Sequence, residues 1–205
     1  MIREFLQRLL QRPDDARRPS LGSDCVWISA AAKLAGIRAE LDKLPGQGVS
    51  IVALVAHFPD VLRALEEIAA EYRGPSSVRA VLARQLSAEA GARLPLGPDA
   101  KLALVVAERH PLAEEDANLV RFAEALPCDA RILYHVSLDD PLLQWFGGES
   151  IRALLRQLGA AAHEPIHHPL IAKSIKRAQE KISAEAHGRD DADSAAQWLE
   201  RNLRR

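Results

Sequence analysis

Three ionisable residues follow an apolar run near the middle of the chain. The run, LALVVA at 102–107, ends at Glu108, Arg109 and His110, and a proline and an acidic helix start that includes Asp116 come next. If the run is a strand of a parallel sheet, these residues lie where such sheets bind ligands, beyond the carboxyl ends of the strands, and they could form the rim of a working site. The alternative is structural: Glu108 and Arg109 form an ion pair, and the acidic residues stabilise the N-terminus of a helix.

Two other groups have the residue types, but not the arrangement, of a catalytic or metal site. His135, Ser137 and Asp139 are the types of a hydrolase triad, but they alternate along one predicted strand and lack the turn that exposes a nucleophile. The segment HEPIHHP at 163–169 holds three histidines, yet its two prolines make a rigid turn and no further Cys, Asp or Glu spacing completes a metal shell. We therefore predict neither a hydrolase nor a metal site.

The sequence contains no phosphate-binding loop. Neither GxxxxGK followed by Ser or Thr nor GxGxxG occurs, and GQG at 46–48 precedes a predicted strand instead of following one. Because backbone amides of such loops hold the phosphates of a nucleotide, we expect no nucleotide cofactor.

Strands alternate with helices over most of the chain. Apolar or β-branched runs predict strands at 25–29, 50–56, 101–107 and 131–138. Ser29 and Pro59 are typical helix starts. The stretch VRAVLA within 74–100 fits a strand or a helix, and the polar members of 131–138 fit the edge or end of a sheet. This order predicts a mostly parallel, doubly wound α/β sheet.

Three segments are expected. Residues 1–23 form an N-terminal helix and a linker, residues 24–147 form the α/β domain, and residues 148–205 form a helical C-terminal region. The first helix would be amphipathic, and it could contact a membrane surface or pack on the protein's own core or on a partner. Its apolar side comprises Ile2, Phe5, Leu6, Leu9 and Leu10.

Charge and composition narrow the class of partner. The chain carries 27 Lys and Arg against 28 Asp and Glu, so it lacks the basic field that holds nucleic acid. Cys25 and Cys128 are too few for a disulfide framework and indicate free thiols in a reducing compartment. The N-terminus interrupts its apolar residues with Arg3, Glu4, Gln7 and Arg8. It therefore holds neither the unbroken apolar core of a signal peptide, about 7–15 residues, nor a membrane span of about 20 residues. We expect a cytoplasmic protein with no integral membrane segment.

Several motifs of the chain resemble the preprotein translocase ATPase SecA, where the second motor domain ends and the scaffold helix begins. The likeness covers roughly residues 24 to 187. In its C-terminal part it rests on Ser137 to Asp140, Leu142, Leu143, Phe146, Gly147, Leu158, Gly159, His168, Pro169 and Arg177 to Lys181. Upstream it rests on Glu108, Arg109, His110, Asp116 and Leu119, and at the entry into the domain on Asp24, Trp27, Ser29 and Lys33. The resemblance implies a RecA-like fold for the α/β domain and a scaffold-like helix after it.

The departures from the family pattern remove its chemistry. The family carries an arginine- and glycine-rich run soon after Glu-Arg-His, whose arginines stabilise phosphoryl transfer. Here that place holds Phe122, Ala123, Ala125 and Leu126, and only Arg121 remains basic nearby. The resemblance therefore implies a vestigial motor motif of Glu108, Arg109, His110, Asp116 and Arg121, with no catalytic residue.

We expect a non-catalytic SecA-like domain that acts as an interaction or adaptor module in protein translocation or secretion. Its partner would be a protein, either a translocon or secretion component or a second copy of the chain. One alternative is an auxiliary subunit that completes an ATP-driven preprotein translocase motor with another chain. Another is an unrelated small-molecule enzyme on the same fold.

The C-terminal region offers candidates for the partner contact. Trp198, Leu199 and Leu203 lie on one side of a short amphipathic helix, and a scaffold helix of this family normally lies along other motor domains. Either these side chains fold back on the sheet domain, or they form an exposed stripe that binds a partner.

Overall fold

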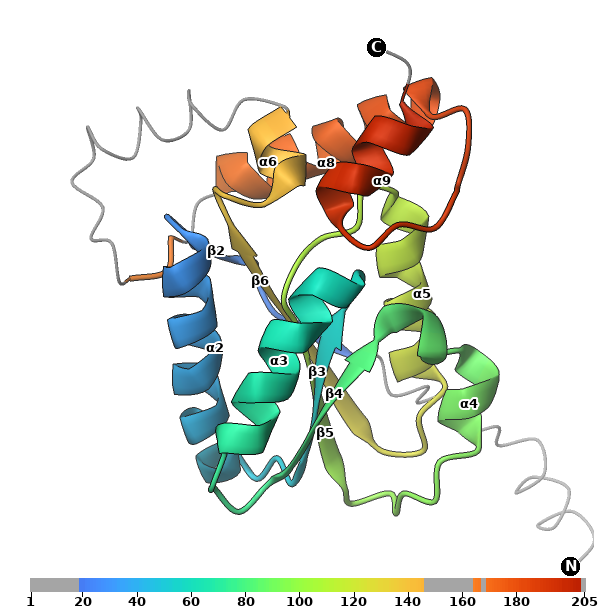
Figure 1. Ribbon diagram of the computed structural model, residues 1–205. Helices are drawn as coiled ribbons and strands as arrows, with labels where there is room; N and C mark the ends of the chain where they lie inside the picture. Colours follow the sequence, from blue (N-terminus) through green and yellow to red (C-terminus); the bar gives the residue numbers. More distant parts are fainter. Residues whose placement is uncertain (1–18, 146–163, 167–168, 204–205) are drawn as a thin grey trace, which may run out of the picture.

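The protein is built around a six-stranded sheet in which every strand pairing is parallel. The computed structural model describes residues 19–145, 164–166 and 169–203 (Figure 1). The strands are β1 (Ser20–Leu21), β2 (Cys25–Trp27), β3 (Ile51–Ala56), β4 (Ser77–Leu82), β5 (Lys101–Val106) and β6 (Asp129–Ser137). Their order is β1-β6-β5-β3-β4, and β2 pairs with the end of β6 beyond β1.

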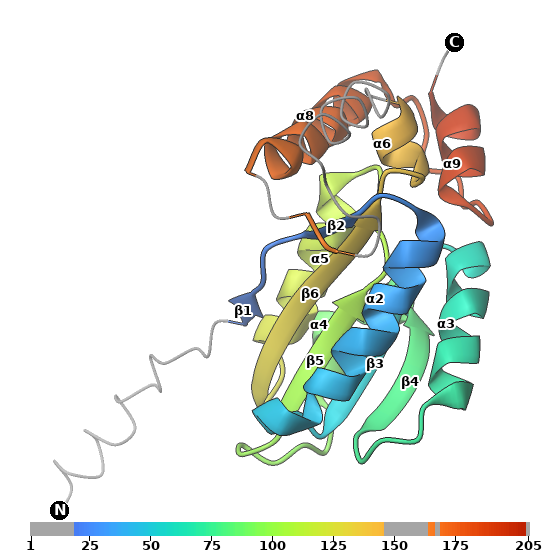
Figure 2. The same ribbon diagram turned by 90° about the vertical axis from the view of Figure 1, so that its left-hand side faces the viewer.

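Helices cover both faces of the sheet. Helices α2 (Ala30–Lys43) and α3 (Pro59–Glu71) pack on one face, and α4 (Ala88–Ala92) and α5 (Ala113–Glu124) on the other (Figure 2). Helices α6 (Pro141–Trp145), α8 (Pro169–Glu185) and α9 (Ala195–Asn202) lie together beyond the carboxyl ends of the strands. Two short 3-10 turns, η1 (Pro45–Gln47) and η2 (Ala83–Gln85), complete the described elements. The predicted doubly wound α/β fold is confirmed, and it is consistent with a RecA-like domain.

The connections change direction between β3 and β5. The chain leaves β3 through α3 toward β4, and it leaves β5 through α5, on the other face, toward β6. In doubly wound sheets, ligands bind in the crevice that opens at such a switch point, outside the carboxyl ends of the strands. The residues after β3 and after β5 are therefore those that decide whether this domain can hold a ligand in the usual place.

The structure decides one open assignment and differs from the expectation for one strand. VRAVLA forms β4, an edge strand paired with β3 alone. Strand β6 is not an edge strand, because β5 pairs along one side and β1 and β2 pair along the other. Its polar residues His135 and Ser137 are consequently buried. The predicted N-terminal helix falls on residues outside the described part of the chain.

Gly36 allows α2 to lie close to the sheet at Trp27. A Cβ atom placed on Gly36 would come within 2.0 Å of the Trp27 ring, which is itself buried. We predict that Gly36→Ala lowers the free energy of unfolding by about 1–3 kcal/mol, despite the better helix propensity of alanine, because the buried ring cannot give way freely. Gly46→Ala is the control, since nothing lies within 4 Å of its Cβ position. Equal urea midpoints for the two variants would contradict the prediction.

The C-terminal region folds back over the sheet domain. Trp198, Leu199 and Leu203 are 3%, 0% and 5% exposed, and they share an apolar cluster with Phe58 and Leu138. Of the two alternatives for these three residues, the structure shows the one in which they fold back on the sheet domain: the carboxyl edge of the sheet covers them, and they form no exposed stripe. Among the described residues, no helix combines the length and apolar character needed to cross a bilayer.

Candidate functional site

The Glu108 side chain occupies the crevice at the switch point. It follows β5, and its Oε1 accepts hydrogen bonds from the backbone N–H groups of His57 (2.9 Å) and Phe58 (3.1 Å), which follow β3. The next free amide of α3, that of Asp60, donates to the backbone carbonyl of Asp193 in the segment before α9 (3.1 Å). Amides at a helix N-terminus are the groups that would bind a phosphate, and here the chain's own oxygen atoms occupy them.

The predicted pair between Glu108 and Arg109 does not form. Glu108 points toward the start of α3, whereas Arg109 forms ion pairs with Asp24 and Asp116. Burial raises the pKa of Glu108 to about 7, although the charges of His57 and Lys33 partly oppose the shift. Glu108 therefore changes its charge near neutral pH.

The raised pKa of Glu108 predicts a specific pH dependence. A carboxyl whose folded-state pKa lies above its unfolded value of 4.5 stabilises the protein at low pH, and that contribution is lost as the pH rises through about 7. Measured by urea unfolding, the stability of the native chain relative to Glu108→Gln should fall by roughly 2 kcal/mol between pH 5 and pH 7. His110 and His135 have lowered pKa values whose causes do not include Glu108, so their contributions cancel in this difference. A difference that does not change with pH would contradict the prediction.

Arg109 lies between two carboxylates and an aromatic ring. It pairs with Asp24, which precedes β2, and with Asp116 of α5 (3.3 Å), and its Cζ lies 3.3 Å from the centroid of the Tyr134 ring. Burial would lower the pKa of Arg109, but Asp116 and Asp24 outweigh this effect and raise it. Both terminal nitrogens of the guanidinium are thus paired with carboxylates, so Arg109 offers no free cation to a phosphate.

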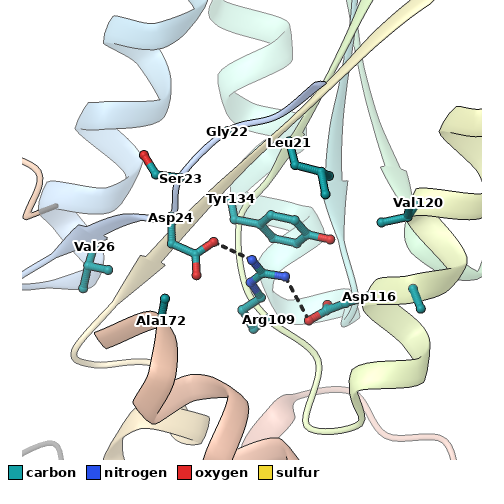
Figure 3. Close-up of a pocket in the computed structure, with 11 residues that line it drawn as sticks. Leu21, Gly22, Ser23, Asp24, Val26, Arg109, Asp116, Val120, Tyr134 and Ala172 are labelled. Atoms are coloured by element: carbon teal, nitrogen blue, oxygen red, sulfur yellow. Dashed lines mark hydrogen bonds and ion pairs between the residues drawn. The ribbon is translucent and has the colours of Figure 1, made fainter. Parts of the chain in front are cut away.

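This cluster forms one wall of a cavity of about 520 Å³ (Figure 3). Figure 3 shows Arg109 in front of the Tyr134 ring, with Asp24 and Asp116 on either side. The rest of the lining is mostly apolar and comes from the β1–β2 segment, α5 and α8: Leu21, Gly22, Ser23, Val26, Ala117, Val120 and Ala172. The cavity lies on the α5 face of the sheet, at its β1 edge, and not at the switch point.

Asp116 joins the loops at the carboxyl edge to α8. Its carboxylate accepts from the backbone amide of His110 (3.2 Å) and from the Gln179 side chain (2.8 Å), and it pairs with Nε2 of His57 (3.1 Å). Burial alone would raise the pKa of Asp116, but the hydrogen bond from His57 and the charge of Arg109 lower it. Asp116 is thus held as a carboxylate by groups from three separate parts of the chain.

His110 is a packing residue. Its ring stacks on Phe58 at 5.2 Å between centroids and meets the edge of Trp198 at 5.4 Å, while Nδ1 accepts from the Leu112 amide (3.0 Å). Burial, helped by His57, lowers its pKa to about 3, so the ring is neutral at ordinary pH. A buried neutral imidazole with a bonded Nδ1 is not placed to act as a general base on an outside substrate.

Arg121 does not join this group. It is exposed on α5 and donates to the Asn118 side chain. Phe122, Ala123 and Leu126, which stand where the resemblance places an arginine- and glycine-rich run, pack in the core under α5.

The three residues that have the types of a hydrolase triad contact separate partners. Nδ1 of His135 accepts from the Trp27 indole (3.2 Å), while the Ser137 hydroxyl donates to Asp140 (2.7 Å). Asp140 also pairs with Lys33 of α2 at 2.6 Å, and Asp139 accepts from the Ala30 amide at the start of that helix. The run Ser137 to Asp140 therefore fastens the end of β6 to α2. The histidines of 163–169 lie outside the described residues, and no metal-binding group of His, Cys, Asp and Glu occurs within the described part.

Comparison with curated proteins is consistent with the family resemblance. Protein translocase subunit SecA of Treponema denticola is 37% identical to the chain over 81 residues, which is 40% of the chain and 9% of that protein. The corresponding subunit of Dechloromonas aromatica is 36% identical over 83 residues (40% and 9%), and that of Christiangramia forsetii is 37% identical over 87 residues (42% and 8%). The chain is thus similar to part of SecA over about two fifths of its own length. It spans less than a tenth of the length of the curated relatives it matches. No family model matches it.

The SecA-like Glu-Arg-His run and Asp116 do come together, but with partners that the sequence did not reveal. His57, Tyr134 and Gln179 complete the cluster, and none of them stands out by type or spacing. Asp24 was named only as a point of resemblance at the entry into the domain, and no contact was predicted for it. The one usable signal was that His57 follows a strand of the same sheet, since carboxyl ends of neighbouring parallel strands meet at one edge.

Proposed function

We propose that this chain is a non-catalytic SecA-like domain that acts as an adaptor between proteins in protein translocation, on the cytoplasmic side of a membrane. The observation that supports this proposal best is the filled switch point. The amides at and just before the start of α3 that could hold a phosphate donate to the chain's own oxygen atoms: those of His57 and Phe58 to Glu108, and that of Asp60 to Asp193. Trp198 of α9 packs against the His110 ring, which stacks on Phe58. The similarity to SecA supports the translocation context.

The surroundings of the basic residues also argue against phosphoryl transfer. Arg109 is neutralised by two carboxylates, and apolar side chains buried under α5 stand where arginines would be needed. A phosphoryl-transfer site needs several preorganised cations around the transferred group. An adaptor needs only a stable surface, and the packing of α8 and α9 on the sheet supplies stability without an open crevice.

We predict that the chain does not bind Mg-ATP in a calorimetric titration. The physical reason is that an incoming triphosphate would have to displace Glu108 from two backbone amides or Asp24 and Asp116 from Arg109. Low-micromolar binding that is lost in Arg121→Ala, but kept in the exposed control Arg84→Ala, would contradict the prediction.

The exposed position of Arg121 motivates the second candidate function. An arginine on the outer side of α5 could reach a nucleotide held by another chain, as in an auxiliary subunit of a preprotein translocase motor. The two candidates separate when a purified SecA is mixed with this chain and both association and ATP hydrolysis are measured. Association without a change in hydrolysis supports the adaptor. A rise in hydrolysis that needs Arg121 supports the auxiliary subunit, and no association with SecA or its translocon would overturn both.

A further inference from the structure

Strand β4 is an open edge of the sheet. Figure 2 shows it as the outermost strand on the side of α3, and within the described part of the chain it pairs with β3 alone. The Ser77 amide donates to the Ser50 carbonyl just before β3 (2.8 Å). Because the backbone groups of successive residues in a strand point to opposite sides, those of Val78 and Ala80 point away from β3.

The strand is regular enough to accept a further strand. It runs for six residues in unbroken register with β3, from Ser77 opposite Ile51 to Leu82 opposite Ala56, and it contains no proline. Near its end the Leu82 amide is already bonded, because it donates to Oε1 of Gln85 (3.1 Å). The amides that an added strand can use are therefore those of Val78 and Ala80.

The sheet face beside this edge is only partly covered. Helix α4 has five residues and packs mainly on α5, so Ile51 and Ala53 of β3 and Val81 of β4 stay partly exposed. Arg79 lies on the same face, opposite Ala53, and is itself exposed. It forms no ion pair with any residue that the structure describes. A strand added to β4 would thus meet an apolar strip and a cation without a counter-charge.

We propose that β4 binds an extended segment of another protein, which adds to the sheet as a further strand and carries a carboxylate beside Arg79. Backbone hydrogen bonds give this mode of binding its affinity, and the alternating side chains give it specificity. Opposite charges on neighbouring strands stabilise the pairing. The assignment deepens the adaptor proposal and rests on it, since an adaptor needs a surface that holds a second protein.

A second copy of the chain fits this edge less well. Two copies of β4 related by a two-fold axis pair antiparallel. The arrangement that joins Val78 of one copy to Ala80 of the other uses both available amides, and it places Arg79 directly opposite the same residue of the other copy. Like charges directly opposite in a sheet are destabilising. The charge of the edge therefore favours an acidic segment over self-association.

An NMR titration of the full-length chain with two short peptides tests the proposal. The probes are Thr-Val-Thr-Glu-Val-Thr, capped at both ends, and the same peptide with lysine in place of glutamate. We expect the glutamate peptide to bind about fivefold more tightly. It should slow hydrogen exchange at the Val78 and Ala80 amides but not at the Arg79 amide, which faces β3. Arg79→Glu should reverse the preference, whereas Lys173→Glu, a matched charge reversal on exposed α8 surface, should not.

Four results would overturn the proposal. The first is that neither peptide binds saturably. The second is binding that persists when the peptide amides are N-methylated, which would exclude backbone pairing. The third is a preference that Arg79→Glu leaves unchanged. The fourth is slowed exchange in the chain alone that grows with protein concentration, which would assign the edge to a second copy. The titration contains no SecA, so its failure would remove this surface, whereas the adaptor proposal fails only if association with SecA and its translocon is absent.

Discussion

Trp198→Ala should lower the free energy of unfolding by about 3–5 kcal/mol, the usual cost of removing a large buried aromatic side chain. Trp198 is 3% exposed and meets His110 edge-on, in a cluster that joins α9 to α8, β6 and the loops after β3 and β5. The cavity left behind would lie between these elements, so the loss should appear in the global urea transition and not only as local fraying of the C-terminus.

Trp145→Ala is the matched control. That tryptophan is 45% exposed on α6, and its replacement should cost less than 1 kcal/mol, as for most surface positions. If Trp198→Ala lowered the free energy of unfolding as little as the control does, α9 would not be packed on the sheet. The residues at the switch point would then not be covered by α9. The experiment therefore checks the same packing on which the predicted lack of nucleotide binding depends.

The positions of β3, β5 and the start of α2 were predictable because local patterns determine them. The unbroken apolar runs of β3 and β5 indicate strands covered on both faces, and Ser29 caps α2 through the Ala32 amide (3.2 Å) as its type predicts. The interior place of β6 was not predictable in this way. It depends on β1 and β2 adding beyond it, and those strands are only 2 and 3 residues long.

The sequence allowed us to predict which residues lie at the end of β5, but not which partners they contact. Glu108, Arg109, His110 and Asp116 do lie together, because they flank the end of one strand and the start of the next helix. Their partners are set by the tertiary fold: Arg109 binds Asp24 across 85 residues, and Asp116 binds Gln179 across 63. The same reason explains why two alternatives stayed open for Trp198, since amphipathic spacing shows that one side of a helix is apolar but not which surface covers it.

Arg109→Ala should destabilise the protein by about 3 kcal/mol, well beyond the cost of a surface ion pair. Removing the guanidinium leaves Asp24 and Asp116 buried and uncompensated, with side chains 9% and 8% exposed, and it removes the contact over Tyr134. Breaking a buried pair by deleting one partner typically costs 3–5 kcal/mol. Arg84→Ala is the control, because Arg84 and Asp191 are 58% and 90% exposed and such pairs contribute at most about 1 kcal/mol.

A second substitution distinguishes this electrostatic cause from a simple loss of packing. In Arg109→Ala, the harm comes from carboxylates without a cation, so adding Asp24→Asn should restore part of the lost stability although it removes another partner of the native cluster. If the cost came only from the missing side-chain volume, the double variant would be no more stable than Arg109→Ala. Urea unfolding of the two variants and of Asp24→Asn alone completes the cycle. A coupling near zero would mean that Arg109 is not the group that keeps these two carboxylates charged inside the fold.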